Sequence, residues 1–294
     1  MSKIILGDPH VNEKSISELE EIFREAMTYS ADTFICLGDI FDKKRPTPRE
    51  ISFITKVVYE LSRRYEKVVL LKGNHDTLTD TLSAIDYLTY IGANVDIVET
   101  YKDEFNNFYG HFFTDKSLFE YGTHKYTTKK LEADYNYTFL GHQHNIQKVS
   151  DKIFHIGSCR YVNFNEVTDE FKQLVKMDDN GKLEFCELNS PIKMQDFDSV
   201  DDLSKCESAK KVRLIVSSFA QFKRDIIKIN EYKNKFKDFK VKLDFEQKLE
   251  TAPTDNKTNV KEKKSLQILV REELAKIEDK EVKQLLEESL IDDN

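Results

Sequence analysis

The chain has 294 residues, of which 39% are hydrophobic and 33% are charged, and its formal net charge is −8. This length gives room for one large domain or two smaller ones, and no apolar run approaches the ~20 residues that a membrane-spanning helix needs. The negative charge does not favour nucleic-acid binding through bulk attraction, although bound metal ions and local basic loops can still act at a site.

The first hundred residues alternate between short β-rich runs and amphipathic segments. Strands are expected at residues 3–6, 33–37, 68–71 and 94–98. Helices should lie between them, so the order β-α-β-α-β-α-β predicts a layered α/β sheet.

Three helices should connect these strands. Ser17 and Glu20 have the spacing of a capping box at the start of the first helix. Thr47 and Pro48 supply a cap and a first-turn proline for the second helix. The third helix is expected from about residue 79 to residue 91, where a glycine follows.

The second half of the chain is richer in β-type runs. Strands are expected at residues 136–140, 146–149, 152–156, 171–177 and 183–188. Short turn sequences separate the later runs, so we expect a meander that forms a second sheet. A small β-α-β unit is expected from strands at 212–217 and 239–245 and a helix between them.

The expected domain organisation has four parts. They are a main domain at residues 1–195, a small domain at 205–250, a polar linker at 251–264 and a helical tail at 265–294.

The four cysteines show neither metal-binding nor disulfide spacing. The chain also opens directly on a predicted strand rather than on a signal peptide. Reduced thiols in a cytoplasmic protein are therefore expected.

Polar side chains of metal-ligand type follow the ends of several predicted strands. They are Asp8 and His10, Asp39 and Asp42, Asn74 with His75 and Asp76, His111, and His142 with His144. In an open α/β sheet the carboxyl ends of the strands carry the site, so we expect these groups to converge. A single His or Asp is more often a turn residue, but five groups at the ends of apolar runs make coincidence improbable.

These residues combine carboxylate, amide and imidazole ligands without a thiolate. That set suits Mn²⁺, Fe or Zn²⁺ better than Mg²⁺. There are too many ligands for one ion, and two ions roughly 3.5–4 Å apart would account for them. Such a pair is typical of phosphoester hydrolysis, and an imidazole left off the metals can protonate the departing alkoxide.

The motifs resemble those of the calcineurin-like metallophosphoesterase superfamily, which run D-x-H, G-D-x-x-D, G-N-H-[DE], a lone His and G-H-x-H. Here they stand as Asp8-Pro9-His10, Gly38-Asp39-Ile40-Phe41-Asp42, Gly73-Asn74-His75-Asp76, Gly110-His111 and Gly141-His142-Gln143-His144. The resemblance covers about the first 160 residues. It implies a four-layer α-β-β-α sandwich. After residue 205, a small α+β capping domain and a C-terminal helical tail are implied by similarity to one branch of the superfamily, the SbcD type.

The resemblance also implies a role for each matching residue. One metal would be held by Asp8, His10, Asp39 and His144, and the other by Asp39 as bridge with Asn74, His111 and His142. His75 would stay off the metals and serve the leaving group, oriented by Asp76. Asp42 would lie behind the ligands or face the substrate.

Within the superfamily the chain resembles the SbcD-type (meiotic recombination eleven-like) nuclease subunit of DNA double-strand-break repair. Arg45-Pro46 after the second motif, His155-Ile156-Gly157-Ser158 and Phe164-Asn165-Glu166 carry this resemblance. It implies a Mn²⁺-dependent exonuclease and endonuclease, DNA as substrate, and an SbcC-type ATPase partner bound by the tail. A homodimer formed by helices near 47–64 and 79–91 is also implied, and the compact length resembles the subunit of T-even phages.

Several alternatives stay open at this point. The segment before His111 is short for the family, so His124 is a second candidate for that position. Lys43, Lys44, Arg45 and Arg49 can contact DNA phosphates or form a solvated loop, and Arg160-Tyr161 can bind nucleic acid or pack.

Two other functions compete with the nuclease. A small-molecule phosphodiesterase or phosphatase is the first, but it needs neither a capping domain nor a tail. A metal-free scaffold is the second, but it has no need of a full set of ligands.

Overall fold

The computed structural model describes residues 1–79, 81–118, 126–206, 210–232, 235–236 and 238–244. These residues divide into two compact units, one spanning Met1–Lys193 and one beginning at Met194. Each unit is described by itself. The expected linker at 251–264, the expected tail at 265–294 and His124 lie outside the described residues.

The first unit contains a six-stranded sheet in the order β13-β12-β1-β2-β3-β6. Four strands are parallel: β1 (Lys3–Leu6), β2 (Thr33–Cys36), β3 (Lys67–Leu71) and β6 (Val95–Val98). Two antiparallel strands extend its edge: β12 (Lys172–Met177) and β13 (Leu183–Leu188). The carboxyl ends of β1, β2 and β3 therefore lie side by side.

The second sheet of this unit has the order β10-β11-β9-β8-β7. Its strands are β7 (Tyr101–Lys102), β8 (Phe108–His111), β9 (Thr138–Gly141), β10 (Gln147–Lys148) and β11 (Ile153–His155). The central strands β8, β9 and β11 are parallel to one another, while β7 and β10 run antiparallel at the edges.

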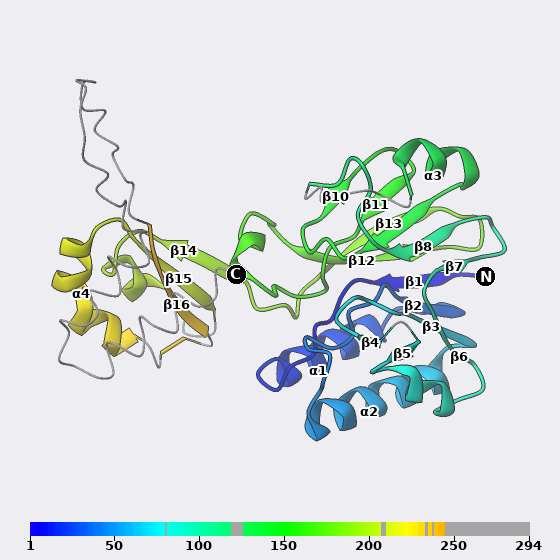
Figure 1. Cartoon of the computed structure of the whole chain (residues 1–294), viewed down its shortest axis with the longest axis horizontal. Coiled ribbons are helices and arrows are strands. Elements are labelled where there is room, and N and C mark those ends of the chain that lie inside the picture. Colours follow the sequence, from blue (N-terminus) through cyan, green and yellow to red (C-terminus); the bar gives the residue numbers. More distant parts are fainter. Residues whose placement is uncertain (80, 119–125, 207–209, 233–234, 237, 245–294) are drawn as a thin grey trace, which may run out of the picture. The chain divides into compact units, whose positions relative to one another are not determined.

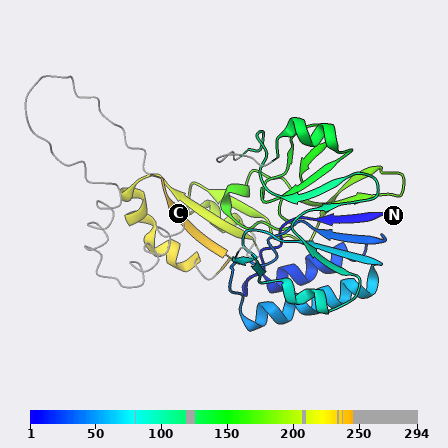
Figure 2. The same cartoon turned by 45° about the vertical axis from the view of Figure 1, so that its right-hand side comes forward.

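Alternation of side chains along the strands builds a four-layer α-β-β-α sandwich (Figures 1 and 2). Ile4 and Phe34 face the helices α1 (Ile16–Ala26) and α2 (Pro48–Arg64), whereas the neighbouring Ile5 packs between the sheets against Phe139. A third core around Phe108 lies under α3 (Thr128–Asp134). The fold class expected from the sequence is confirmed.

Helix starts were predicted with mixed success. The capping box of α2 is present, with Thr47 accepting from the Glu50 amide and Glu50 accepting from the Thr47 amide. For α1 the prediction of Ser17 as cap was wrong, because the helix begins two residues earlier with Ser15 at the cap position.

The helix expected at 79–91 is also wrong. The segment forms a hairpin of β4 (Thr77–Thr79) and β5 (Leu82–Ser83) followed by the 3₁₀ helix η1 (Asp86–Tyr90). Ser83 explains the break, since its hydroxyl donates to the Asp76 carbonyl at 3.0 Å and its amide donates to the Asp86 carboxylate at 2.7 Å. Bonds of this kind offer the backbone an alternative to a helical turn.

The expected second-half meander was wrong in its connections. β9 and β11 pair in parallel, and β12 with β13 joins the first sheet through β1 rather than extending the second. The hairpin turn between β12 and β13 is nevertheless where the sequence placed it, at Asp178–Gly181, with Gly181 at a φ of 79°.

The second unit has a parallel three-stranded sheet in the order β14-β15-β16, with β14 at Met194–Phe197, β15 at Lys211–Val216 and β16 at Asp238–Leu243. The 3₁₀ helix η3 (Asp202–Lys205) follows β14, and α4 (Phe219–Tyr232) connects β15 to β16. The predicted β-α-β order is therefore present. Val212, Leu214 and Val241 contribute to its core.

No helix among the described residues combines the length and apolar character required to cross a bilayer.

Candidate metal centre

The predicted site residues converge in the first unit at the carboxyl ends of five strands. β1, β2 and β3 deliver them from one sheet, and β8 and β9 deliver them from the other. Three groups of side chains have ligand atoms within 4.8 Å of one another. They are Asp8 with His10 and His144, His10 with Asp39 and His75, and Asp39 with His111 and His142.

Asp39 belongs to the group with His111 and His142 and also lies close to the group of Asp8, His10 and His144; these are the two outer groups. Its Oδ2 atom is 3.5 Å from His10 Nε2 on one side and 3.2 Å from His111 Nε2 on the other. Its Oδ1 atom accepts a hydrogen bond from the His75 amide at 2.9 Å. One carboxylate therefore reaches the imidazoles of both groups.

Several buried polar atoms of the cluster have no hydrogen-bond partner among the described residues. They are Oδ1 of Asp8 and both ring nitrogens of His10. Asp8 is fully buried and His10 is 1% exposed. Buried polar atoms are normally satisfied, so these orphaned ligand atoms, all of a type that divalent metals accept, fit a site for cations.

The backbone at the site is strained in a way that serves this convergence. His10, Asp39 and His142 have φ values of 46°, 45° and 76°, a region that costs energy for residues other than glycine. The His10 amide donates to the Asp39 carbonyl at 3.0 Å, and the His142 amide donates to Asp8 Oδ2 at 2.7 Å. These bonds hold the three loops against one another.

Two glycines of the motifs are required by close approach. A Cβ at Gly141 would lie 2.5 Å from Asp8 Oδ1, and a Cβ at Gly73 would lie 2.0 Å from Asp39 Oδ1. Any side chain at these positions would displace a carboxylate of the cluster. This is the physical reason that the G-H-x-H and G-N-H motifs begin with glycine here.

Burial and charge set the protonation of the cluster. Burial raises the pKa of Asp8 to about 6 and lowers the pKa of His10 to about 4. Burial disfavours the charged form of Asp39 as well. The hydrogen bond from His111 and the positive charge of that ring outweigh burial and lower the pKa of this carboxyl. Burial alone would lower the pKa of His111, but the negative charge of Asp8 and the hydrogen bond to Asp39 outweigh it and raise the pKa to about 9.

His111 takes its place through the backbone of the neighbouring sheet. It is the last residue of β8, and its Nδ1 donates to the Leu37 carbonyl at 2.8 Å. The opposite nitrogen, Nε2, is then left facing Asp39 and lies 3.2 Å from Asn74 Oδ1. The short segment before His111 is thus no obstacle, because the hairpin of β7 and β8 needs few residues to reach the site.

His75 and Asp42 lie together at the edge of the cluster. Nδ1 of His75 donates to the Asp42 carbonyl at 2.7 Å, which leaves Nε2 as the atom available to a substrate or a metal. The Asp42 carboxylate is 3.5 Å from His10 Nδ1 and is partly exposed. His75 also belongs to one of the three ligand groups, so it is close enough to serve either role.

Asp76 does not orient His75, contrary to the expectation from the motif. Its buried carboxylate accepts from the amides of Ile40, Phe41 and Gly73, at 3.0–3.1 Å. It therefore ties the loop after β2 to the loop after β3. The Asp42 carbonyl takes over the role of orienting the imidazole.

The role of Glu166, which lies in the 3₁₀ helix η2 (Phe164–Glu166), was not predicted from the sequence. Its fully buried carboxylate is 3.3 Å from His144 Nδ1 through Oε1 and 2.6 Å from Lys172 Nζ through Oε2. A carboxylate behind a histidine fixes the ring and the tautomer of a metal ligand. Two signals in the sequence pointed to this segment without giving the role: the resemblance of Phe164-Asn165-Glu166 to the SbcD-type motif, and the spacing of Asn163 and Glu166, which form a capping box.

Arg160 was considered as a nucleic-acid contact, but the structure gives it a packing role. It is 4% exposed and donates to the carbonyl of Pro9 at 2.9 Å and to that of His10 at 2.6 Å. The guanidinium therefore braces the loop that carries Asp8 and His10. Tyr161 is buried as well and donates to the Asp169 carbonyl.

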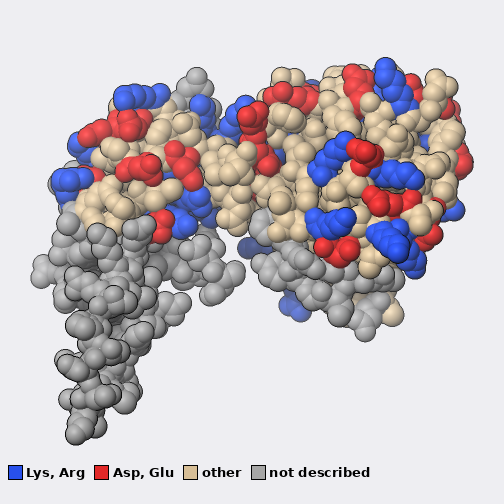
Figure 3. All heavy atoms as spheres, turned by 90° about the horizontal axis from the view of Figure 1, so that it is seen from above, with Lys and Arg blue, Asp and Glu red and all other residues tan. Residues whose placement is uncertain are grey.

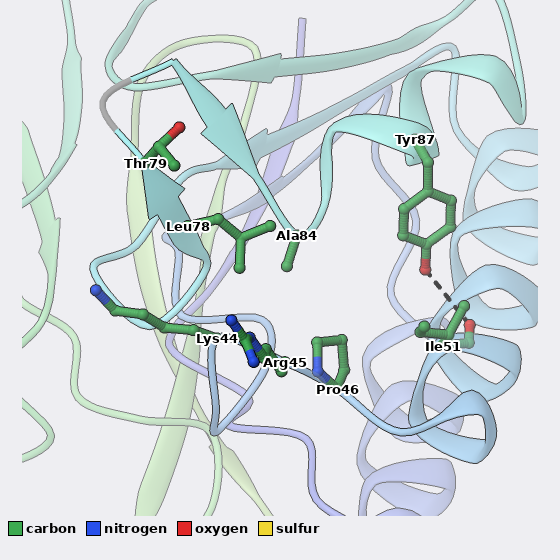
Figure 4. A pocket seen from close by; sticks show the side chains of 8 residues that line it. All are labelled: Lys44, Arg45, Pro46, Ile51, Leu78, Thr79, Ala84 and Tyr87. Atoms are coloured by element: carbon green, nitrogen blue, oxygen red, sulfur yellow. Dashed lines mark hydrogen bonds between the residues drawn. The ribbon is translucent and has the colours of Figure 1, made fainter.

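The basic residues after β2 remain on the surface. Lys43, Lys44, Arg45 and Arg49 are exposed, and Lys44 and Arg45 line a pocket of about 700 Å³. Figure 4 shows these two side chains opposite Leu78 and Ala84, with Tyr87 bonded to the Ile51 carbonyl at one end. Elsewhere, on the face shown in Figure 3, acidic and basic side chains are interspersed.

A family model described as calcineurin-like phosphoesterase matches residues 1–212 of the chain. The chain belongs to this family. Phosphoester hydrolysis with divalent metals is therefore its chemistry, and the three ligand groups are where those metals would be held. No curated protein matches the chain.

Several solved structures also match the chain, at low sequence identity. An archaeal phosphodiesterase is 18% identical and aligns with 64% of this chain and 100% of its own, with a TM-score of 0.40. A Vps29 mutant from Entamoeba histolytica is 15% identical over 64% of this chain and 100% of its own (TM-score 0.38). The nuclease MPE of Pseudomonas putida is 16% identical over 59% and 83% (TM-score 0.35).

Proposed function

We propose that the protein is a Mn²⁺-dependent DNA nuclease of the SbcD type, which hydrolyses phosphodiester bonds with two metal ions. The observation that carries the proposal is the position of Asp39, whose Oδ2 atom faces His10 on one side and His111 on the other. Such a bridging carboxylate is what a pair of ions needs. When bound, the ions would supply an activated water and neutralise charge on the phosphate.

Each ion has its own set of side chains in this proposal. The first would be held by Asp8, His10, Asp39 and His144, and the second by Asp39, Asn74, His111 and His142. Oxygen and imidazole nitrogen ligands without sulfur suit Mn²⁺.

His75 serves the leaving group. Because its Nδ1 proton is donated to the Asp42 carbonyl, a second proton can only sit on Nε2, on the open side of the ring. From there the imidazolium donates to the departing alkoxide as a general acid. The fixed bond to Asp42 keeps the ring aimed during this transfer.

Exposed basic side chains beside the cluster support DNA as the substrate. Lys43, Lys44 and Arg45 follow Asp42, and Arg49 lies in the first turn of α2. These side chains would meet the phosphates that flank the cleaved bond. We further propose the unit that begins at Met194 as a DNA-capping domain, residues 265–294 as the segment that binds an SbcC-type ATPase, and a homodimer through α2. Exposed Tyr59 on α2 and exposed Tyr90 on η1 suit such an interface.

The experiment compares the purified chain with His75→Ala on linear DNA in the presence of Mn²⁺. We expect the wild type to degrade DNA and the variant to lose about 10²–10⁴-fold in kcat, with its Mn²⁺ content unchanged. Lys148→Ala, at an exposed position of the edge strand β10, is the control and should keep nuclease activity. Hydrolysis of a cyclic dinucleotide with no action on DNA would favour a small-molecule phosphodiesterase instead.

A further inference from the structure

A cavity of about 300 Å³ opens beside the second ligand group and is distinct from the basic pocket of Figure 4 in all of its lining except Thr79. Asn74 and His111 form one of its walls. These are two of the residues assigned to the second ion, so the cavity begins where the phosphate of a substrate would be held. A group attached to that phosphate can reach it directly.

A pair of aromatic rings also lines the cavity. Phe112 and Tyr126 stack with ring centroids 4.7 Å apart and planes 22° from parallel. Both rings also contact Phe108, at 6.1 Å and 5.4 Å, and Phe108 is buried in the core under α3. The pair is therefore held in place before any ligand arrives, and it can present a flat apolar face at low entropic cost.

The charge of the lining argues against a second phosphate in the cavity. Its cation, Lys72, is paired with Asp86 at 2.8 Å, and the exposed carboxylate of Glu99 is also part of the lining. The described lining thus has no unpaired cation to receive another anion. The remaining lining is made of threonine and serine hydroxyls and of Leu82, which is 52% exposed.

We propose that this cavity receives a single unpaired nucleobase of the nucleotide adjoining the cleaved phosphate. A base is flat, uncharged and polar at its edge, which matches a stacked aromatic wall with hydroxyls such as those of Thr81 and Thr100 around it. The volume suits one nucleoside, and a base has to leave its duplex to enter such a cavity. The inference rests on the proposed nuclease function and adds that the substrate is unpaired at the point of cleavage.

The test uses short oligothymidylates that carry one abasic residue, with Mn²⁺ and the full chain. In the wild type we expect kcat/KM at a phosphate next to the abasic residue to be about 5- to 100-fold lower than at the same phosphate in the intact strand, the range measured for one base on an aromatic side chain. In Phe112→Leu, which keeps an apolar side chain against Phe108 but offers no flat face, this ratio should approach one.

Two further variants are compared with Phe112→Leu. Leu82→Ala alters an exposed position of the lining, where folding is not at stake, and should lower the ratio less than Phe112→Leu. Phe185→Ala changes an aromatic residue that is 43% exposed and outside the lining, and should keep the wild-type ratio. Equal cleavage of intact and abasic strands by the wild type would overturn the inference and leave the nuclease standing. Failure to cleave either strand would overturn both.

Discussion

The two outer ligand groups meet at Asp39 but are supported in different ways. Charged side chains support His144 in the first group, since Glu166 lies 3.3 Å from its Nδ1 and Lys172 lies 2.6 Å from Glu166. His142 in the second group is backed by neutral groups, with the Phe113 ring 4.2 Å away. The first ligand group is therefore supported by the buried pair of Glu166 and Lys172, whereas the second ligand group faces the cavity lined by Phe112 and Tyr126.

The difference has consequences for protonation. Burial disfavours a charged His144, but the bond and charge of Glu166 outweigh burial and raise its pKa. No carboxylate among the described residues backs His142 in this way, and burial lowers its pKa to about 4. A metal in the first group therefore competes with protons for His144, while the second group presents His142 already neutral.

The largest effect on activity is expected at Asp39, which both ligand groups share in this proposal. Asp39→Asn removes the carboxylate that faces His10 and His111, so both ions lose a ligand. We expect a loss of more than about 10³-fold in kcat/KM, equivalent to several kcal/mol of transition-state stabilisation. Steady-state hydrolysis of a phosphodiester with Mn²⁺ checks this, and activity within tenfold of wild type would contradict the shared role of Asp39.

A smaller effect is expected behind the first group. Glu166→Gln removes the charge that orients His144, and should weaken binding of one of the two ions by about 10- to 100-fold while the other is retained. Calorimetric titration with Mn²⁺ measures both affinities. Asp169→Asn is the matched control, because Asp169 also contacts Lys172, at 2.8 Å, but does not contact His144. Equal losses in the two variants would mean that Glu166 acts only through folding.

A buried and neutral histidine, His155, supports the second ligand group. His155 lies beneath Gly141, is 1% exposed, and shares a 2.7 Å hydrogen bond with Ser117. Burial lowers its pKa from 6.5 to about 3. Between these values the unfolded chain binds a proton that the folded chain does not, so the free energy of unfolding decreases as the pH falls from about 6.5 to about 3.

This contribution amounts to roughly 5 kcal/mol over the whole interval, and to roughly 3 kcal/mol between pH 6.5 and pH 4. In His155→Gln the fall should be shallower by that amount, because glutamine does not titrate. Urea denaturation of metal-free protein at several pH values between 4 and 7 provides the comparison. Parallel curves for wild type and variant would show that His155 is protonated in the folded chain.

Much of the site was predictable from the sequence because its ligands follow apolar runs directly. The parallel strands β1, β2 and β3 are buried, so the residues after Leu6, Leu37 and Leu71 had to emerge at one edge of the sheet. A layered α/β sheet was predictable for the same reason, whereas the four-layer arrangement was implied by the resemblance of the motifs.

The parts that could not be predicted depend on tertiary contacts. Asp76 was expected to orient His75, but its three amide partners come from loops that are adjacent only in the folded chain. Glu166 follows His144 by 22 positions, and nothing local marks it as its partner. The helix expected after residue 79 failed because Ser83 bonds to its own neighbourhood instead of continuing a helical turn.

The central claim is that two ion sites share Asp39, and counting bound metal tests it most directly. Wild-type protein loaded with Mn²⁺, freed of excess metal and analysed by atomic spectrometry should contain two ions per chain. His142→Ala and His144→Ala should each contain one, because each loses a ligand from a different group. A single ion in the wild type, or loss of both ions in each variant, would contradict the claim.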